Sequence, residues 1–168
     1  MKGTNGHVLY LDFDGCLHHQ NCLWHPLIGP YLSTPEGGNY VLFQHAELLE
    51  KTLEPYPKVE IVLSTAWTLR YGWSRTSKYL RPRLRSRVIG ATFHSLMSKS
   101  DFSELPRGVQ VLRDVQRRKP QSWVAIDDDF SGWPEATLDR YVRTHERDGI
   151  SDPEALWNLK QKLSEMCK

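Results

Sequence analysis

The sequence predicts an α/β fold, with a parallel sheet, helices on both of its faces, and a small loop or hairpin insertion. Two observations favour this class. Short apolar runs alternate with longer amphipathic segments, a pattern typical of strands joined by crossover helices. Acidic or hydroxyl side chains directly follow several of the apolar runs, as they do where parallel strands end at a ligand site. The 168 residues suffice for one domain, residues 1–168, with a substantial core.

The first strand is expected over residues 7–12, where an apolar run ends in an acidic residue. Residues 15–40 are rich in proline and glycine, which favours turns and a small cap-like hairpin rather than a separate domain. A helix is expected next over 42–53, ending before Pro55, and a strand over 59–63 follows it. A second helix is expected over 68–80, where Pro82 ends it. A short strand over 87–89 then precedes a turn at Gly90.

The second half of the chain continues the alternation. An amphipathic helix is expected over 107–118, and an apolar strand over 123–126. A short helix near 134–138 and a strand over 141–143 follow. Residues 151–154, Ser-Asp-Pro-Glu, have the pattern of a capping box with proline inside it, so we expect the last helix to begin there.

Two of the apolar runs end in carboxylates. Asp12 and Asp14 are two residues apart, so their side chains leave the strand end on the same side. The other run ends in three consecutive residues, Asp127, Asp128 and Asp129. Each group by itself also fits a solvated turn, because Asp and Gly commonly end strands. Together the two groups predict a site for Mg²⁺, which prefers hard oxygen ligands and often binds together with substrate phosphate.

Two hydroxyls and a cation complete the candidate site. Ser64 and Thr65 follow the strand over 59–63, where hydroxyls either cap the next helix or donate hydrogen bonds to a phosphoryl oxygen. Arg107 is expected at the start of a helix, where anions already bind well. Lys99 is the alternative cation, and we favour Arg107 for its position at the helix start.

The order acid pair, hydroxyl, cation, acid cluster resembles that of the haloacid dehalogenase (HAD) superfamily of phosphohydrolases. The matching segments are Asp12-Phe13-Asp14-Gly15, Ile61-Val62-Leu63-Ser64, Arg107 and Asp127-Asp128. The resemblance covers most of the chain, and the set is more specific than any one motif. In closer detail the chain is similar to the small HAD domain of Swiss-army-knife RNA repair proteins. This similarity lies in residues 63–67, 87–92, 124–129 and 148–151.

The resemblance implies a Rossmann-like, HAD-type fold and a Mg²⁺-dependent phosphatase that acts through an aspartyl-phosphate. In this scheme Asp12 is the nucleophile, Asp14 is the general acid and base, and Ser64 and Arg107 contact the phosphoryl oxygens. The implied metal ligands are Asp12, Asp14 through its backbone carbonyl, Asp127 and Asp128, with Asp129 supporting them. The residues expected to bind substrate are Thr65, Arg70 and Lys99. Arg70 departs from the close family, in which an arginine directly follows the tryptophan of this motif.

The charge of the chain is unevenly distributed, although its net value is only +2. Residues 61–100 contain no Asp or Glu, and their Lys and Arg residues are interleaved with aromatic side chains. Such a segment is typical of nucleic-acid surfaces, but it also fits a solvated helix face that balances the acidic site. The small insertion over 15–40 favours an open site that admits a macromolecular end. We therefore expect a phosphorylated end of RNA or DNA as the substrate.

Histidines and tryptophans near the motifs are secondary candidates for substrate contacts. Loop histidines are more often exposed to solvent and without a role, and we expect this of His18, His19 and His25. Tryptophans stack on bases in some proteins, but packing in the core is the more common role. The tryptophans concerned are Trp24, Trp67 and Trp73.

The composition favours a cytoplasmic protein. Cys16, Cys22 and Cys167 are odd in number and lack the spacing of a metal site, so reduced thiols are expected. No apolar run is long enough to cross a membrane, and residues 1–6 lack the apolar stretch of a signal peptide. We therefore expect no membrane partner.

Three other functions compete with this interpretation. The same chemistry on a small metabolite or nucleotide predicts turnover with little salt dependence. A non-catalytic module that binds nucleic acid predicts salt-sensitive binding without turnover, and the intact acid pairs argue against it. A receiver-type phosphoacceptor domain also clusters aspartates on an α/β sheet, but it needs a lysine after its fifth strand, and residues 141–144 contain none.

Overall fold

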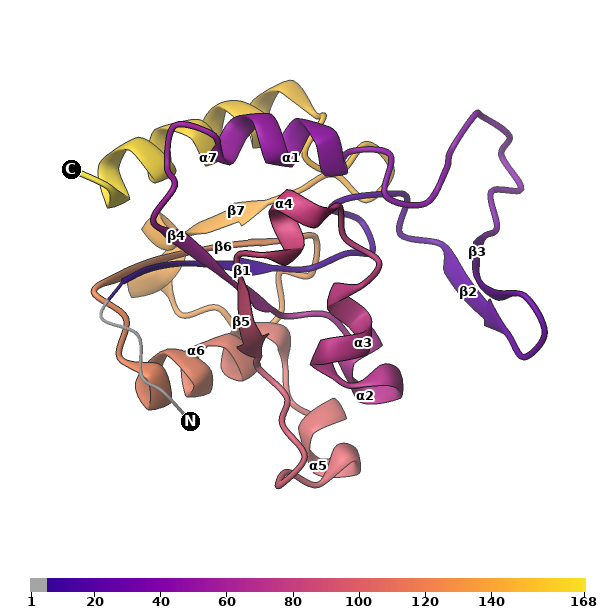
Figure 1. The fold of residues 1–168 in the computed structure, drawn as a ribbon, viewed down its shortest axis with the longest axis horizontal. Coiled ribbons are helices and arrows are strands. Elements are labelled where there is room, and N and C mark those ends of the chain that lie inside the picture. Colours follow the sequence, from indigo (N-terminus) through magenta and orange to yellow (C-terminus); the bar gives the residue numbers. More distant parts are fainter. Residues whose placement is uncertain (1–5) are drawn as a thin grey trace.

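A computed structural model describes residues 6–168 of the chain. The expectation that residues 1–6 form no signal peptide therefore lies almost entirely outside the described residues. A five-stranded parallel sheet of order β5-β4-β1-β6-β7 forms the centre, and an antiparallel β2–β3 hairpin projects from one end of the molecule (Figure 1). The strands are β1 (His7–Leu11), β2 (Cys22–His25), β3 (Gly29–Leu32), β4 (Val59–Leu63), β5 (Val88–Ala91), β6 (Ser122–Asp127) and β7 (Tyr141–Arg143).

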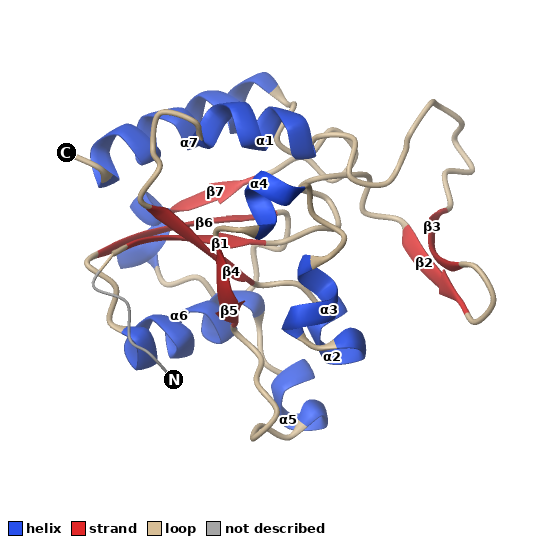
Figure 2. Ribbon diagram, in the orientation of Figure 1, coloured by secondary structure: helices blue, strands red, loops and turns tan. Residues whose placement is uncertain are grey.

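Helices cover both faces of this sheet. Figure 2 shows α1 (Ala46–Leu53) and α7 (Pro153–Met166) on one face and α6 (Arg107–Arg118) on the other. The shorter helices are α2 (Trp67–Tyr71), α3 (Trp73–Ser77), α4 (Pro82–Arg85), α5 (Lys99–Ser103) and the 3-10 helix η1 (Glu135–Arg140). The predicted α/β fold, a parallel sheet with helices on both faces and a small hairpin, is confirmed. Within residues 6–168, none of the helices combines the length and the apolar character needed to cross a membrane.

The central strand β1 contributes side chains to two hydrophobic cores. Leu9 and Leu11 point into the core beneath α1 and α7, whereas Val8 and Tyr10 point into the core beneath α6. All four side chains are fully buried. A strand covered on both faces is apolar at every position, which is why β1 appears in the sequence as a continuous apolar run.

Two boundaries in the basic segment differ from the predictions because of glycine. The single helix predicted over 68–80 is wrong, since Gly72 adopts a φ of +73° and separates α2 from α3. Gly90 lies within β5 and not in a turn after it. The pairing of β5 with β4 shifts register between Ile61 and Val62, and the glycine accommodates this irregularity.

The starts of α1 and α7 also differ from the predictions. α1 begins four residues later than predicted, because Phe43 adopts a φ of +57° that a helix does not allow. At α7 the helix cap is Asp152, whose carboxylate accepts a hydrogen bond from the Ala155 N–H at 3.0 Å. The capping box predicted from Ser151 to Glu154 is therefore wrong, because the Ser151 hydroxyl donates to the Asp148 carbonyl and the residue three after Asp152 is Ala155. Pro153 lies in the first helical turn, as predicted.

The loop after β7 packs tightly against the loop after β1. The Thr144 hydroxyl donates to the Gly15 carbonyl at 2.7 Å, and the Ile150 N–H donates to the Cys16 carbonyl at 2.9 Å. Gly149 lies directly over the Cys16 carbonyl with a φ of +54°, and a Cβ at this position would overlap that oxygen. A side chain at Gly149 is therefore excluded both by conformation and by space.

The close contact at Gly149 predicts a stability difference between two glycines. Gly37 has a φ of +81°, but a Cβ at this position would meet no atom of the described residues within 4 Å, so Gly37→Ala introduces only the conformational strain. We expect Gly149→Ala to lower the free energy of unfolding by about 1–3 kcal/mol more than Gly37→Ala, through overpacking. Urea unfolding of both variants measures the difference. If both variants lost the same free energy of unfolding, the close contact with the Cys16 carbonyl would contribute nothing to the effect of Gly149→Ala.

Candidate active site

The acidic and hydroxyl residues meet because three neighbouring strands end side by side. Leu11 of β1 pairs with Leu63 of β4 and with Ile126 of β6, so the residues that follow lie at one edge of the sheet. These residues are Asp12, Ser64 and Asp127. In parallel sheets the carboxyl ends of the strands form the ligand-binding edge.

Three carboxylates form the centre of the site. Asp12, Asp127 and Asp128 each offer an oxygen, and these oxygens lie within 4.8 Å of one another. Asp12 and Asp127 are almost completely buried, at 3% and 1% exposure. Gly15, with a φ of +71°, lets Asp128 approach the first loop, because a Cβ at Gly15 would overlap the Asp128 carboxylate. Asp129 contributes its backbone N–H, which donates to Asp127 Oδ1 at 2.9 Å.

Arg107 is the cation of this cluster. Its Nε lies 3.0 Å from Asp127 Oδ2, and its Nη2 lies 3.8 Å from Asp12 Oδ1. Its Nη1 donates to the Ser64 carbonyl and, at 3.3 Å, to Gln110 Oε1. The guanidinium thus contacts the ends of β1, β4 and β6, and it comes from the first turn of α6.

The electrostatics of the cluster follow from burial. Burial raises the pKa of Asp12 well above its ordinary value, and the neighbouring Asp127 raises it further, while Arg107 opposes both. Burial likewise raises the pKa of Asp127 to about 7 and that of Asp128 to about 6, again against Arg107. One guanidinium is too little positive charge for three carboxylates, so the ionised cluster attracts a further cation.

The donor set fits a hard divalent cation such as Mg²⁺. Its ligands would be carboxylate oxygens, and within residues 6–168 the buried Asp127 Oδ2 receives no directed hydrogen bond, although Arg107 Nε is near. The buried Ser64 hydroxyl also has no hydrogen-bond partner in the described part of the chain. A buried polar atom without a partner is costly, and a bound phosphoryl oxygen would accept from this hydroxyl.

A second group of possible metal ligands, Asp14, His18 and Cys22, does not fit a metal. His18 Nδ1 accepts from the Phe43 N–H at 3.2 Å, so the ring proton is on Nε2, which then donates to Asp14 Oδ1 at 2.8 Å. Burial raises the pKa of the Cys22 thiol to about 12, with the Asp14 carboxylate contributing. Because both ring nitrogens of His18 already make hydrogen bonds, fewer than three side chains of this group are free to ligate a cation.

Two hydrogen-bond donors hold the Asp14 side chain. Trp67 Nε1 lies 3.1 Å from both carboxylate oxygens, and His18 Nε2 donates to Oδ1 at 2.8 Å. Trp67 itself packs edge-on against Phe13 and Phe43. The Asp14 carboxylate is therefore held in a fixed orientation, with 31% of its side chain exposed.

The expectation of exposed histidines is wrong for two of the three. His18 and His19 are buried, at 0% and 1% exposure, and only His25 is exposed. His19 Nε2 contacts Glu36 Oε1 at 2.7 Å and its ring packs against Tyr40. The signal for His18 in the sequence is its place four residues after Asp14, which is compatible with a side-chain contact within one tight loop.

The three residues expected to bind substrate have different surroundings. Thr65 Oγ1 accepts from the Trp67 N–H at 3.4 Å, at the start of α2, and Thr65 is buried. Arg70 stacks on the ring of Trp24, 4.1 Å from its centre, and thereby connects α2 to the hairpin. Lys99 is exposed on α5 and forms no ion pair within residues 6–168, so Arg107 is the cation among the acids.

The basic segment does not form one continuous surface. The Arg87 guanidinium donates to the carbonyls of Leu53, Tyr56 and Val59, and Arg81 pairs with Glu50 at 3.3 Å. α4 leads into the start of β5, so its arginines lie at the edge of the sheet opposite the site. The basic residues that follow the carboxyl end of β4 are Arg70, Arg75 and Lys78.

Comparison with known families agrees with this geometry. The family model described as "HAD domain in Swiss Army Knife RNA repair proteins" matches residues 8–155, which include every segment of the site. Searches of curated proteins and of solved structures gave no match. The resemblance inferred from the motifs is confirmed, and the chain belongs to the HAD domains of Swiss Army Knife RNA repair proteins.

Proposed function

We propose that the protein is a Mg²⁺-dependent phosphatase that removes a terminal phosphate from an RNA or DNA end. The observation that supports it most is the buried cluster of Asp12, Asp127 and Asp128 around Arg107, with the unpartnered Ser64 hydroxyl beside it. Membership of the HAD family supports phosphatase chemistry. A decayed, purely binding module has no reason to keep buried, uncompensated carboxylates.

The proposed reaction has two steps. Asp12 attacks phosphorus, the bond from phosphorus to the leaving oxygen breaks, and Asp14 gives that oxygen its proton. Asp14 then takes a proton from water, and the water oxygen attacks the aspartyl-phosphate. This second step releases inorganic phosphate and regenerates the Asp12 carboxylate. Asp14 suits both steps because it is held by Trp67 and His18 yet partly exposed.

Other residues stabilise charge in these steps. The Ser64 hydroxyl donates to a phosphoryl oxygen, and Arg107 neutralises charge spread over these oxygens. Asp12, Asp127, Asp128 and the Asp14 carbonyl are the proposed Mg²⁺ ligands. When bound, the cation supplies the positive charge that keeps Asp12 ionised and lets it approach a phosphate dianion.

The nucleic-acid part of the proposal rests on the surface near Asp14 and on the family. Arg70, Arg75 and Lys78 are exposed on α2 and α3 or just after them, and Trp24 and Trp73 are 41% and 44% exposed. Cations with exposed aromatic rings suit a single-stranded nucleic acid. We also propose a cytoplasmic location, because all three cysteines are free.

The first experiment measures phosphate release with and without Mg²⁺ from a 3′-phosphorylated oligonucleotide, a 5′-phosphorylated oligonucleotide and an aryl phosphate. We expect metal-dependent release that favours one oligonucleotide end. Asp12→Asn should abolish turnover, a loss of at least about 1,000-fold, with unfolding unchanged. Release only from the aryl phosphate would reject the nucleic-acid substrate, and turnover near the normal rate in Asp12→Asn would reject the nucleophile.

Because its pKa is raised, Asp128 should lower the free energy of unfolding of the metal-free protein as the pH rises. The folded state binds the proton of the Asp128 carboxyl more tightly than the unfolded state does. The stabilising effect of this proton is therefore present below pH 4 and is lost as pH rises through about 6. In EDTA, Asp128→Asn should therefore gain stability relative to the parent between pH 4 and 7. We expect a gain on the order of 1 kcal/mol after solvent screening.

Urea unfolding with and without Mg²⁺ tests this linkage. Added Mg²⁺ should stabilise the parent more than Asp128→Asn at pH 7.5, because the variant lacks a ligand. Asp139→Asn is the control, since that side chain is 72% exposed on η1. If the free energies of unfolding of the parent and of Asp128→Asn differed by the same amount at every pH, the predicted effect of Asp128 would be contradicted.

The contact between His18 and Asp14 predicts a positioning effect on turnover. His18→Asn keeps an acceptor for the Phe43 N–H but loses the donor to Asp14, whereas His18→Gln places an amide N–H near the Nε2 position. We expect kcat to fall about 10-fold or more in His18→Asn, with little change in KM and partial recovery in His18→Gln. Equal kcat values in the two variants would indicate a merely structural histidine.

A further inference from the structure

A pocket of about 300 Å³ lies between the β2–β3 hairpin and α2, and Asp14 forms part of its wall. We propose that this pocket binds the nucleobase of the nucleotide that bears the scissile phosphate. The inference rests on the proposed function and adds a binding site for the leaving group. Its walls include Trp24 and Pro30 from the hairpin, and Arg70 and Tyr71 from α2.

The position of Asp14 determines what enters this pocket. Asp14 gives its proton to the leaving oxygen, so the group attached to that oxygen lies on the side that Asp14 faces. The Trp67 and His18 hydrogen bonds fix the Asp14 carboxylate, and Asp14 lines the pocket together with residues of the hairpin. On a polynucleotide end, the leaving oxygen belongs to the terminal nucleoside, and the terminal base is then the nearest large group.

The chemistry of the walls suits a nucleobase. Trp24 remains 41% exposed, and the planar Arg70 guanidinium lies 4.1 Å from the centre of its ring. Flat aromatic and guanidinium groups bind bases by stacking, with little dependence on sequence. Arg70 is exposed and pairs with no carboxylate within residues 6–168, so its charge is available to the phosphodiester that follows the terminal nucleotide. The volume lies at the lower end of the range for small-molecule pockets, roughly 300–1,000 Å³, which suits one ring system.

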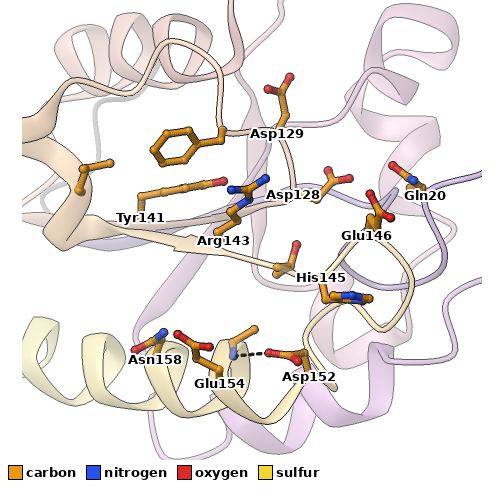
Figure 3. A pocket seen from close by; sticks show the side chains of 14 residues that line it. Gln20, Asp128, Asp129, Tyr141, Arg143, His145, Glu146, Asp152, Glu154 and Asn158 are labelled. Atoms are coloured by element: carbon orange, nitrogen blue, oxygen red, sulfur yellow. Dashed lines mark hydrogen bonds between the residues drawn. The ribbon is translucent and has the colours of Figure 1, made fainter.

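The larger pocket on the other side of the acidic cluster is a poor alternative. It has a volume of about 870 Å³ beside Asp128 and Asp129. Figure 3 shows Glu146 on the side of Asp128, and Asp152 and Glu154 across the pocket at the start of α7. Its walls contain five carboxylates and a single arginine, Arg143. These charges repel a phosphodiester chain, so the polynucleotide leaves on the hairpin side.

The first test compares substrates in the full chain. We would measure kcat/KM with Mg²⁺ for a phosphorylated trinucleotide and for glycerol phosphate, which has no base. Trp24→Ala should lower the ratio of the two values about 10-fold or more, the size of one lost stacking contact. Arg70→Ala should lower the ratio too, and should weaken its dependence on salt. Trp157→Ala is the matched control, because Trp157 is 62% exposed on α7, and it should leave the ratio unchanged.

A second measurement separates this proposal from the phosphatase assignment. Binding of the phosphorylated trinucleotide to Asp12→Asn needs no turnover, and adding Trp24→Ala to this variant should weaken it about 10-fold or more. If the parent chain releases no phosphate from any substrate while Trp24→Ala still weakens this binding, the result would support the pocket and reject the phosphatase. Equal binding with and without Trp24, or an equal loss of kcat/KM on both substrates, would reject the pocket.

Discussion

The structure of the site depends on one interaction, the contact of Arg107 with the buried carboxylates Asp12 and Asp127. Burying two carboxylates side by side is costly unless a cation accompanies them. Because the guanidinium also donates to the Ser64 carbonyl, the first turn of α6 is held against the ends of β1, β4 and β6 together. The cluster still has more negative than positive charge. The same arrangement that makes the fold possible therefore leaves a site for one more cation.

Close backbone packing determines which side chains can reach this cluster. Gly15 allows the Asp128 carboxylate to lie over the first loop, and Gly149 allows the loop after β7 to cover Cys16. Both glycines have positive φ, so their place is set by conformation as well as by space. The late segment 148–151 shares in the family resemblance, and the structure gives it a physical role: it supports the loop that bears Asp12 and Asp14.

The two sides of the site have opposite chemistry. On one side Asp14 is held by uncharged donors and faces a pocket whose walls carry aromatic rings and the Arg70 guanidinium. On the other side Asp128 and Asp129 border a larger and strongly acidic pocket. A phosphate dianion needs the cationic centre, and its leaving group needs a surface without further negative charge. This asymmetry favours binding of the polynucleotide on the side of the hairpin in the proposed reaction.

The sequence by itself determined the places of the five sheet strands, the helix over 107–118, the acidic residues of the site and the preference for Arg107. The spacing of apolar residues and the position of a helix start are local properties of the chain. It also determined the family, since the motifs keep their order along the chain. Only the tertiary structure decided that His18 is buried against Asp14, that Trp67 donates to the same carboxylate, and that the basic segment is divided between two edges of the sheet. These features depend on which segments pack together, and no local pattern records the burial or the hydrogen-bond partner of a single side chain.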